Sequence, residues 1–121
     1  MTDENNIPKE PFGAAPFGLV TAALDGTIIS VNSTFLNWSG AKRQSLILGR
    51  RFDDLLTVAS SKDFNTKLLP KLLRQSYFHA APMRLALEDG ALDVIVSSNV
   101  DADFDGKAVA INMVFFYGFK N

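Results

Sequence analysis

Cysteine is absent from this chain of 121 residues, and histidine and tryptophan each occur once. Without a thiol the protein cannot form disulfides, thiolate metal sites, iron–sulfur clusters or cysteinyl adducts. No glycine-flanked serine accompanies His79, so a Ser-His-Asp triad is not indicated. The sequence also lacks a phosphate-binding glycine loop and a pair of catalytic carboxylates. We therefore predict no catalytic residues and no enzymatic activity.

Charge of one dominant sign and long apolar runs are also missing. Twelve basic residues against thirteen acidic ones leave a net charge of −1, so no global field attracts nucleic acid or an anionic membrane. No apolar run approaches the roughly 20 residues that span a bilayer, and the N-terminus lacks the layout of a signal peptide. We expect a cytoplasmic protein with no nucleic-acid partner and no membrane contact.

Turn signals are what the chain does contain. Asp-Gly occurs at 25–26, 89–90 and 105–106, each time between runs of aliphatic or β-branched residues. Asp-Gly favours hairpins because both central residues of a type I′ turn need positive φ. Three hairpins imply five strands, which we place at residues 18–24, 27–31, 83–88, 92–100 and 107–117.

The N-terminal segment and the middle of the chain do not show the pattern of these strands. Three of the five prolines lie within residues 1–16, which we interpret as a flexible tail or linker before a single domain at 17–121. Asn32 should cap a helix that Gly40 ends. A second helix should begin at Ser60, and Pro70 should kink or divide it; its apolar stripe is Phe64, Leu68 and Leu72.

An acidic pattern before the last strand resembles the opening of a calcium-binding EF-hand loop. Asp101, Asp103 and Asp105 precede Gly106 at the required spacing, but the position of the bidentate glutamate is taken by Asn112. Strands are expected on both sides of this loop, where an EF-hand has helices. We predict a solvated hairpin end and no metal site.

Three further residues have both a structural and a functional interpretation. His79 could ligate haem iron, although an exposed histidine at a strand start is far commoner. Trp38 could stack on a flavin or another flat ligand, although a tryptophan on a short apolar helix usually belongs to the core. Asn112 is an amide within an apolar strand and needs hydrogen-bond partners; it is either a satisfied structural group or a donor that orients a ligand.

The order of strand, strand, helices and three strands, read with the segments at 18–35, 38–40, 48–56 and 69–75, resembles a PAS domain. The resemblance covers about residues 17 to 117, and the motifs are similar to those of the bacterial PAS subgroup found ahead of histidine kinase, cyclase or serine-phosphatase outputs. It implies an α+β fold: a five-stranded antiparallel sheet in spatial order 2-1-5-4-3, with short helices packed across one face. It also implies a small pocket between the helices and the sheet. The residues we assign to that pocket are Val20, Ala22, Ile29, Val31, Phe35, Trp38, Asn112 and Val114.

The chain departs from the PAS pattern in two ways. It lacks the cysteine of flavin-adduct photosensors. Residues 116–118 replace the Asp-x-Thr that couples the last strand to a signalling helix in the PAS pattern, and we expect no output domain in this chain. We therefore expect a stand-alone module or an excised piece, purified without a cofactor. Haem-binding or flavin-binding sensors remain less favoured alternatives.

The last strand is apolar on both faces, so one face needs cover beyond the helices. We predict a homodimer formed through one alternating set with help from two phenylalanines near the N-terminus: Val109, Ile111, Met113 and Phe115, with Phe12 and Phe17. The function implied is a sensory or interaction module that binds a small ligand, a signalling output domain or a partner protein. Two alternatives stay open, namely a pocketless PAS domain used only for dimerisation and a small α+β enzyme.

Overall fold

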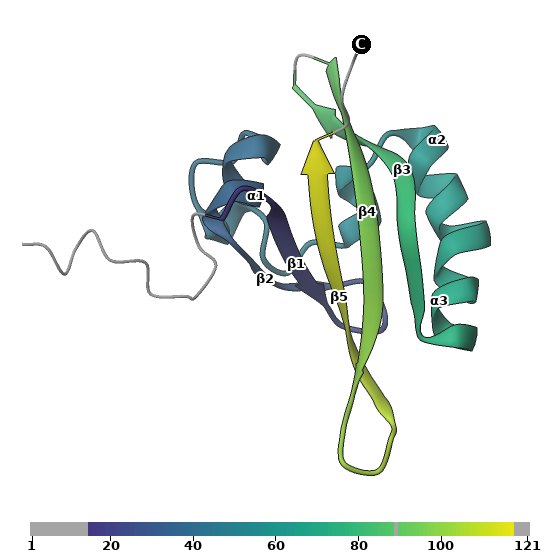
Figure 1. Ribbon diagram of the computed structural model, residues 1–121. Coiled ribbons are helices and arrows are strands. Elements are labelled where there is room, and N and C mark those ends of the chain that lie inside the picture. Colours follow the sequence, from purple (N-terminus) through teal and green to yellow (C-terminus); the bar gives the residue numbers. More distant parts are fainter. Residues whose placement is uncertain (1–14, 89, 118–121) are drawn as a thin grey trace, which may run out of the picture.

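The computed structural model describes residues 15–88 and 90–117, which form a five-stranded antiparallel sheet with helices on one face (Figure 1). The order of strands across the sheet is β2-β1-β5-β4-β3, as predicted. Their bounds are Gly18–Ala22 for β1, Ile28–Val31 for β2, Tyr77–Leu87 for β3, Gly90–Ala102 for β4 and Ala108–Tyr117 for β5. The last strand therefore lies in the centre, between β1 and β4.

The hairpins at residues 25–26 and 105–106 are confirmed, but their turn type is not the one expected. In both turns only the glycine has positive φ, at 95° for Gly26 and 79° for Gly106. The Gly26 N–H donates to the carbonyl of Ala23 at 2.9 Å, which closes an i to i+3 turn over residues 23–26. A left-handed glycine after such a turn replaces the type I′ geometry. Asp89 lies outside the described residues.

Helix α1 (Ser33–Ser39) begins and ends where the sequence predicts. The Asn32 side chain accepts a hydrogen bond from the Phe35 N–H, and Gly40 closes the helix with φ of 80°. Two short 3₁₀ turns follow, η2 (Gln44–Leu46) and η3 (Phe52–Leu55). No helix in the described part of the chain is long and apolar enough to cross a membrane.

The second helical stretch starts three residues earlier than expected. Thr57 caps α2 (Val58–Asp63) by accepting from the Ser60 N–H at 3.4 Å. The predicted cap, Ser60, instead accepts from the Arg84 N–H at 2.9 Å and so joins α2 to β3. The prediction that this helix begins at Ser60 is therefore wrong.

Pro70 divides this helical stretch by a change of helix type. It opens α3 (Leu69–Gln75), while the preceding segment η4 (Phe64–Leu68) is a π-helix in which the Leu69 N–H donates to the Phe64 carbonyl five residues earlier. Pro70 has no N–H for the preceding turn, and single widened π turns of this kind occur within α-helices. Helix α3 then packs along β3 (Figure 1).

Strand β3 is longer than predicted because two sequence signals against a strand are tolerated there. Pro82 lies within it, but β3 is at the edge of the sheet, where a missing N–H is acceptable. Between Phe78 and Ala81 the register shifts, so that His79 and Ala80 together face Ser97. This bulge changes the alternation and lets both Phe78 and Met83 point into the core.

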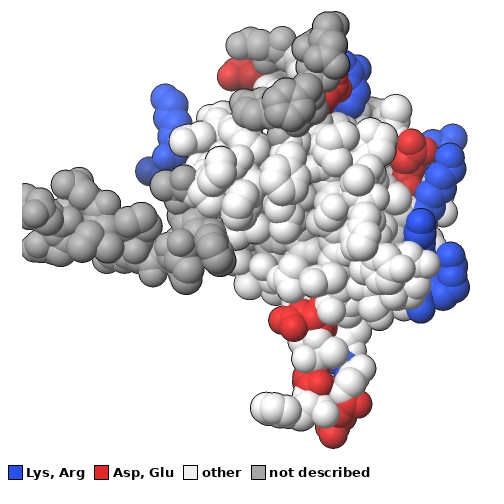
Figure 2. All heavy atoms as spheres, viewed as in Figure 1, with Lys and Arg blue, Asp and Glu red and all other residues white. Residues whose placement is uncertain are grey.

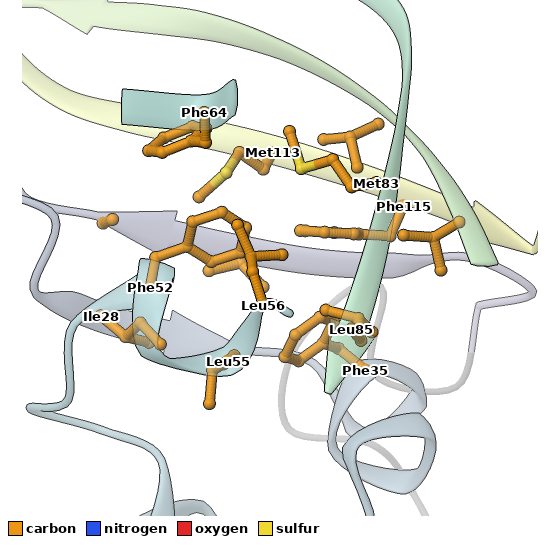
Figure 3. Close-up of a cluster of buried hydrophobic side chains, with 14 of the residues drawn as sticks. Ile28, Phe35, Phe52, Leu55, Leu56, Phe64, Met83, Leu85, Met113 and Phe115 are labelled. Atoms are coloured by element: carbon orange, nitrogen blue, oxygen red, sulfur yellow. The ribbon is translucent and has the colours of Figure 1, made fainter. Parts of the chain in front are cut away.

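The core lies between the helices and the inner face of the sheet (Figure 3). Phe35 from α1 and Phe52 from η3 contact Phe115 of β5, with ring centroids 4.9 and 5.7 Å apart. Phe64 packs edge-on against Phe52 at 5.2 Å. Met83 and Met113 complete this layer from β3 and β5 (Figure 3).

Candidate functional site

Four of the predicted pocket residues come together in the core. Val20, Ala22, Val31 and Phe35 are all buried. Ile29 does not join them: its side chain is 53% exposed, and Ile28 is buried in its place. The cause is a register shift between β1 and β2 that pairs Ala22 with Ile28, because a one-residue shift turns a strand's side chains to the opposite face.

Trp38 packs over β1 at Gly18, beside Phe35. A Cβ atom on Gly18 would lie 3.2 Å from Trp38 Cζ3 and 3.1 Å from Phe35 Cδ1. The helix therefore sits directly on the strand backbone at this glycine. The indole is partly buried against the core, in agreement with the structural interpretation of this residue.

A cavity of about 260 Å³ opens beside the end of α1. Phe35, Ile47, Leu55 and Leu85 supply its apolar side, whereas Ser39, Arg50 and Asp54 supply polar groups. The cavity is smaller than the roughly 300–1,000 Å³ of typical ligand sites. A small molecule with an apolar body would fit it better than a multi-ring cofactor.

Flavin does not fit the layer between the helices and the sheet. Phe35, Phe52, Phe64 and Phe115 are buried there in mutual ring contact. A flat ligand in that layer would have to displace close-packed rings. We derive no function through a flavin.

Haem does not fit either, because His79 lies on the opposite side of the sheet from the helices. Its side chain is exposed, and its ring packs against Tyr77 with centroids 4.8 Å apart. The core layer and the cavity beside α1 are both out of its reach.

The outer face is the side of the sheet turned away from the helices. Asn112 and Val114 of β5 lie on it, together with Phe116. Ile111, Met113 and Phe115 point the other way and are buried beneath the helices. The assignment of these three side chains to an exposed dimer face is therefore wrong.

The three remaining residues of the predicted dimer interface are Val109, Phe17 and Phe12. Val109 is exposed near the start of β5. Phe17 lies at the start of the described domain, with its ring centroid 5.9 Å from that of Phe116. Phe12 lies outside the described residues, as does most of the predicted tail at 1–16.

Side chains on the outer face form rows that cross the strands. One row is polar and spans all five strands through paired positions: Ser30, Thr21, Asn112, Asn99 and Tyr77. Within it, Thr21 Oγ1 donates to Asn112 Oδ1 at 3.1 Å, and Asn112 Nδ2 donates to Asn99 Oδ1 at 3.3 Å. The side-chain amide of Asn112 therefore has hydrogen-bond partners, as expected, but these lie on the half-buried outer face of the sheet.

A second row is apolar and lies nearer the other end of the outer face. Phe116 pairs with Ile95, and Ile95 pairs with Pro82; Phe17 packs on Phe116 from the β1 side. Figure 2 shows that this face is broadly uncharged, with acidic and basic side chains gathered around its rim. An ion pair of 2.6 Å between Arg84 and Asp93 borders the apolar row.

The acidic hairpin end has a structural arrangement. Asp103 Oδ1 accepts hydrogen bonds from the N–H groups of Asp105 and Lys107, each at 2.9 Å. One carboxylate therefore organises the turn. Among residues 15–88 and 90–117, no three His, Asp or Glu side chains are grouped to hold a metal ion.

Sequence reasoning did not identify Tyr77, Ile95 or Phe116 as surface residues of interest. For Ile95 the signal is the alternation along β4, where Val94, Val96 and Ser98 are buried and the residues between them face outward. Counting from Val94 would have placed Ile95, Ser97 and Asn99 on one face.

Comparison with known proteins finds similar structures but no match by sequence. No family model and no curated protein matches the chain. A PAS domain from Colwellia psychrerythraea superimposes with a TM-score of 0.81 at 14% identity, covering 91% of this chain and 92% of that one. The PAS domain of an HTR-like protein from Haloarcula marismortui gives 0.69 at 18% identity, with coverage of 88% and 85%.

A light-oxygen-voltage domain studied with a flavin analogue is also similar, with a TM-score of 0.76 at 18% identity over 90% of this chain and 82% of that one. The agreement extends over nearly the whole chain and includes the strand order that the resemblance to PAS domains implied. This chain has the PAS fold.

Proposed function

We propose that the protein is a non-catalytic sensory and interaction module of bacterial signal transduction that relays its state through the outer face of its sheet. The observation that carries this proposal is the apolar row formed by Phe17, Phe116, Ile95 and Pro82. Phe116 is 46% exposed although it lies in the central strand. The PAS fold of its structural neighbours is consistent with a sensory role.

A second copy of the chain is the partner that we propose for this row. The face is uncharged at its centre, so two copies related by a twofold axis can bring it together without opposing like charges (Figure 2). Contiguous apolar surface rimmed by polar groups is typical of protein interfaces. The dimer proposed here uses the face opposite to the one predicted from the alternation of β5, because Ile111, Met113 and Phe115 are occupied by the core.

Light scattering coupled to size-exclusion chromatography tests the interface. We expect a dimer at high micromolar concentration for the unmodified protein, and monomers for Phe116→Asp and Ile95→Asp. Phe104→Asp is the matched control, because Phe104 is fully exposed at the tip of the β4–β5 hairpin, away from the row. A monomeric unmodified protein, or equal dissociation of the control, would contradict the proposed interface.

The cavity beside α1 favours a second, compatible function, the binding of a small ligand. Its lining combines apolar side chains of Phe35, Leu55 and Leu85 with polar groups of Arg50 and Ser39, a combination typical of ligand sites. Native mass spectrometry of the purified protein should show a bound small molecule that is lost in Ala86→Trp, since Ala86 lines the cavity. Identical spectra for both proteins would rule this ligand site out.

A further inference from the structure

The polar end of the outer face contains a hollow that neither the proposed interface nor the cavity beside α1 uses. It has a volume of about 360 Å³ and is lined by Tyr77, His79, Ser97, Asn99, Asn112 and Val114. It lies over β3, β4 and β5, on the side of the sheet away from the cavity beside α1. We propose that this hollow binds a neutral, planar heterocycle of the nucleobase type, with adenine as the best match.

The lining selects a neutral ligand. It contains no Asp, Glu, Lys or Arg side chain. A charged ligand would give up hydration there without gaining an opposite charge. A neutral ring with hydrogen-bonding edges loses less hydration on entering.

The amides of the polar row offer a paired donor and acceptor. Asn99 Oδ1 accepts from Asn112 Nδ2 at 3.3 Å and keeps a second lone pair. Asn99 Nδ2 has no hydrogen-bond acceptor within the described part of the chain. An asparagine amide with both groups available matches the N6 donor and N7 acceptor of adenine in a bidentate arrangement.

The aromatic pair supplies a stacking surface beside these amides. The rings of Tyr77 and His79 lie 4.8 Å apart with planes at 36°, and both side chains are exposed. Aromatic rings of this kind stack on nucleobases regardless of base identity. The rings would therefore hold the heterocycle, and the amide of Asn99 would select its edge.

Backbone strain is located at the same place. Ala80 has φ of 55°, which is unfavourable for a residue with a side chain, and its N–H donates to Ser97 Oγ at 2.9 Å. The bulge turns both Phe78 and Met83 into the core and also holds His79 and Ala80 together opposite Ser97. Strained bulges that redirect side chains are over-represented next to binding sites.

Titration of ¹⁵N-labelled full-length protein with adenosine tests this inference. We expect saturable shifts of the side-chain amide signals of Asn99 and Asn112, and at least about a tenfold weaker affinity in Asn99→Ala and in Tyr77→Leu. Asn37→Ala is the matched control, because Asn37 is an exposed amide on α1; its affinity should equal that of the unmodified protein. Thermal unfolding of each variant confirms that it is folded.

Parallel titrations separate the alternatives. Uridine should bind more weakly than adenosine, and glucose should not bind. The inference would be overturned if adenosine caused no shifts up to about 10 mM, a concentration beyond any specific affinity. Equal shifts with glucose would also overturn it. The inference does not rest on the proposed dimer: repeating the titration in Phe116→Asp reads the site independently of the interface.

Discussion

Asn32 and Leu19 are joined by two hydrogen bonds that run in opposite directions. The Leu19 N–H donates to Asn32 Oδ1 at 2.9 Å, and the Asn32 N–H donates to the Leu19 carbonyl at 3.0 Å. The same side chain caps α1 at Phe35 and donates from Nδ2 to the Phe17 carbonyl at 2.9 Å. One amide, 3% exposed, thus holds the first strand to the first helix.

Replacement of Asn32 by alanine should lower the free energy of unfolding by about 3 kcal/mol, since a helix cap and buried main-chain partners are lost together. Asn32→Asp should cost less, because a carboxylate keeps the acceptor bonds to Leu19 and Phe35. Urea unfolding followed by circular dichroism measures both. Asn37→Ala on the same helix is the control, with a change within about 0.5 kcal/mol; an equal loss in Asn37→Ala would contradict the role of Asn32.

Gly18→Ala should destabilise the protein by about 1–3 kcal/mol, the usual cost of adding volume to a close-packed core. The new Cβ would lie 3.1 Å from Phe35 Cδ1 and 3.2 Å from Trp38 Cζ3. Phe35 is fully buried and has little room to move. Trimming the indole by Trp38→Leu in the Gly18→Ala background should recover part of the loss. Unchanged stability in Gly18→Ala would show that the helix shifts freely on the strand.

The stability of the protein should fall in acid partly through Asp53. Partial burial opposes ionisation of this carboxyl, but hydrogen bonds from Asn65 at 3.0 Å and Arg51 at 3.1 Å outweigh it and hold its pKa below the ordinary value. A pKa lower in the folded than in the unfolded protein contributes stability above the unfolded value, which is lost as the pH falls through the folded one.

The check is the free energy of unfolding measured in urea from neutral pH down to about pH 3, below the ordinary aspartate pKa. Asp53→Asn should be less stable than the unmodified protein at neutral pH and should show a shallower acid dependence. Asp54→Asn, an exposed neighbour with no side-chain ion pair among the described residues, is the control. Parallel curves for Asp53→Asn and the unmodified protein would count against this role.

Asn112→Val should change the free energy of unfolding by no more than about 1 kcal/mol. The substitution removes the bonds to Thr21 and Asn99, but these partners lie on the outer face, where water can replace the lost group. Valine also suits a strand position. The midpoint of denaturant unfolding decides the matter. A loss of several kcal/mol would show instead that the hydrogen bonds of Asn112 are essential to the fold.

Local signals were sufficient for a large part of this structure. The turns at residues 25–26 and 105–106, the cap at Asn32 and the end of α1 at Gly40 follow from hydrogen bonds and φ preferences within a few residues. The strand order of the sheet came from the resemblance to PAS domains, since no local signal says that β5 pairs with β1. Residues 17–117 therefore had a predictable architecture before any tertiary contact was known.

The orientation of each strand depended on contacts that are distant in the sequence. Strand β5 is apolar on both faces, so alternation defined two sets of side chains without indicating which set the helices cover. The first half of β3 was not predicted, because it contains Pro82 and the bulge at Ala80. The register shift between β1 and β2 places Ile28 in the core in place of Ile29.

The outer face of the sheet is likewise a product of tertiary structure. Tyr77, Asn99 and Asn112 are separated by 13 residues or more in the chain, yet strand pairing places them in one row. Turns and caps are decided by energies within a few residues, whereas a row across a sheet exists only after the register of every strand is set by the packing of the core. For this reason the elements could be predicted from the sequence, and the surface that they jointly build could not.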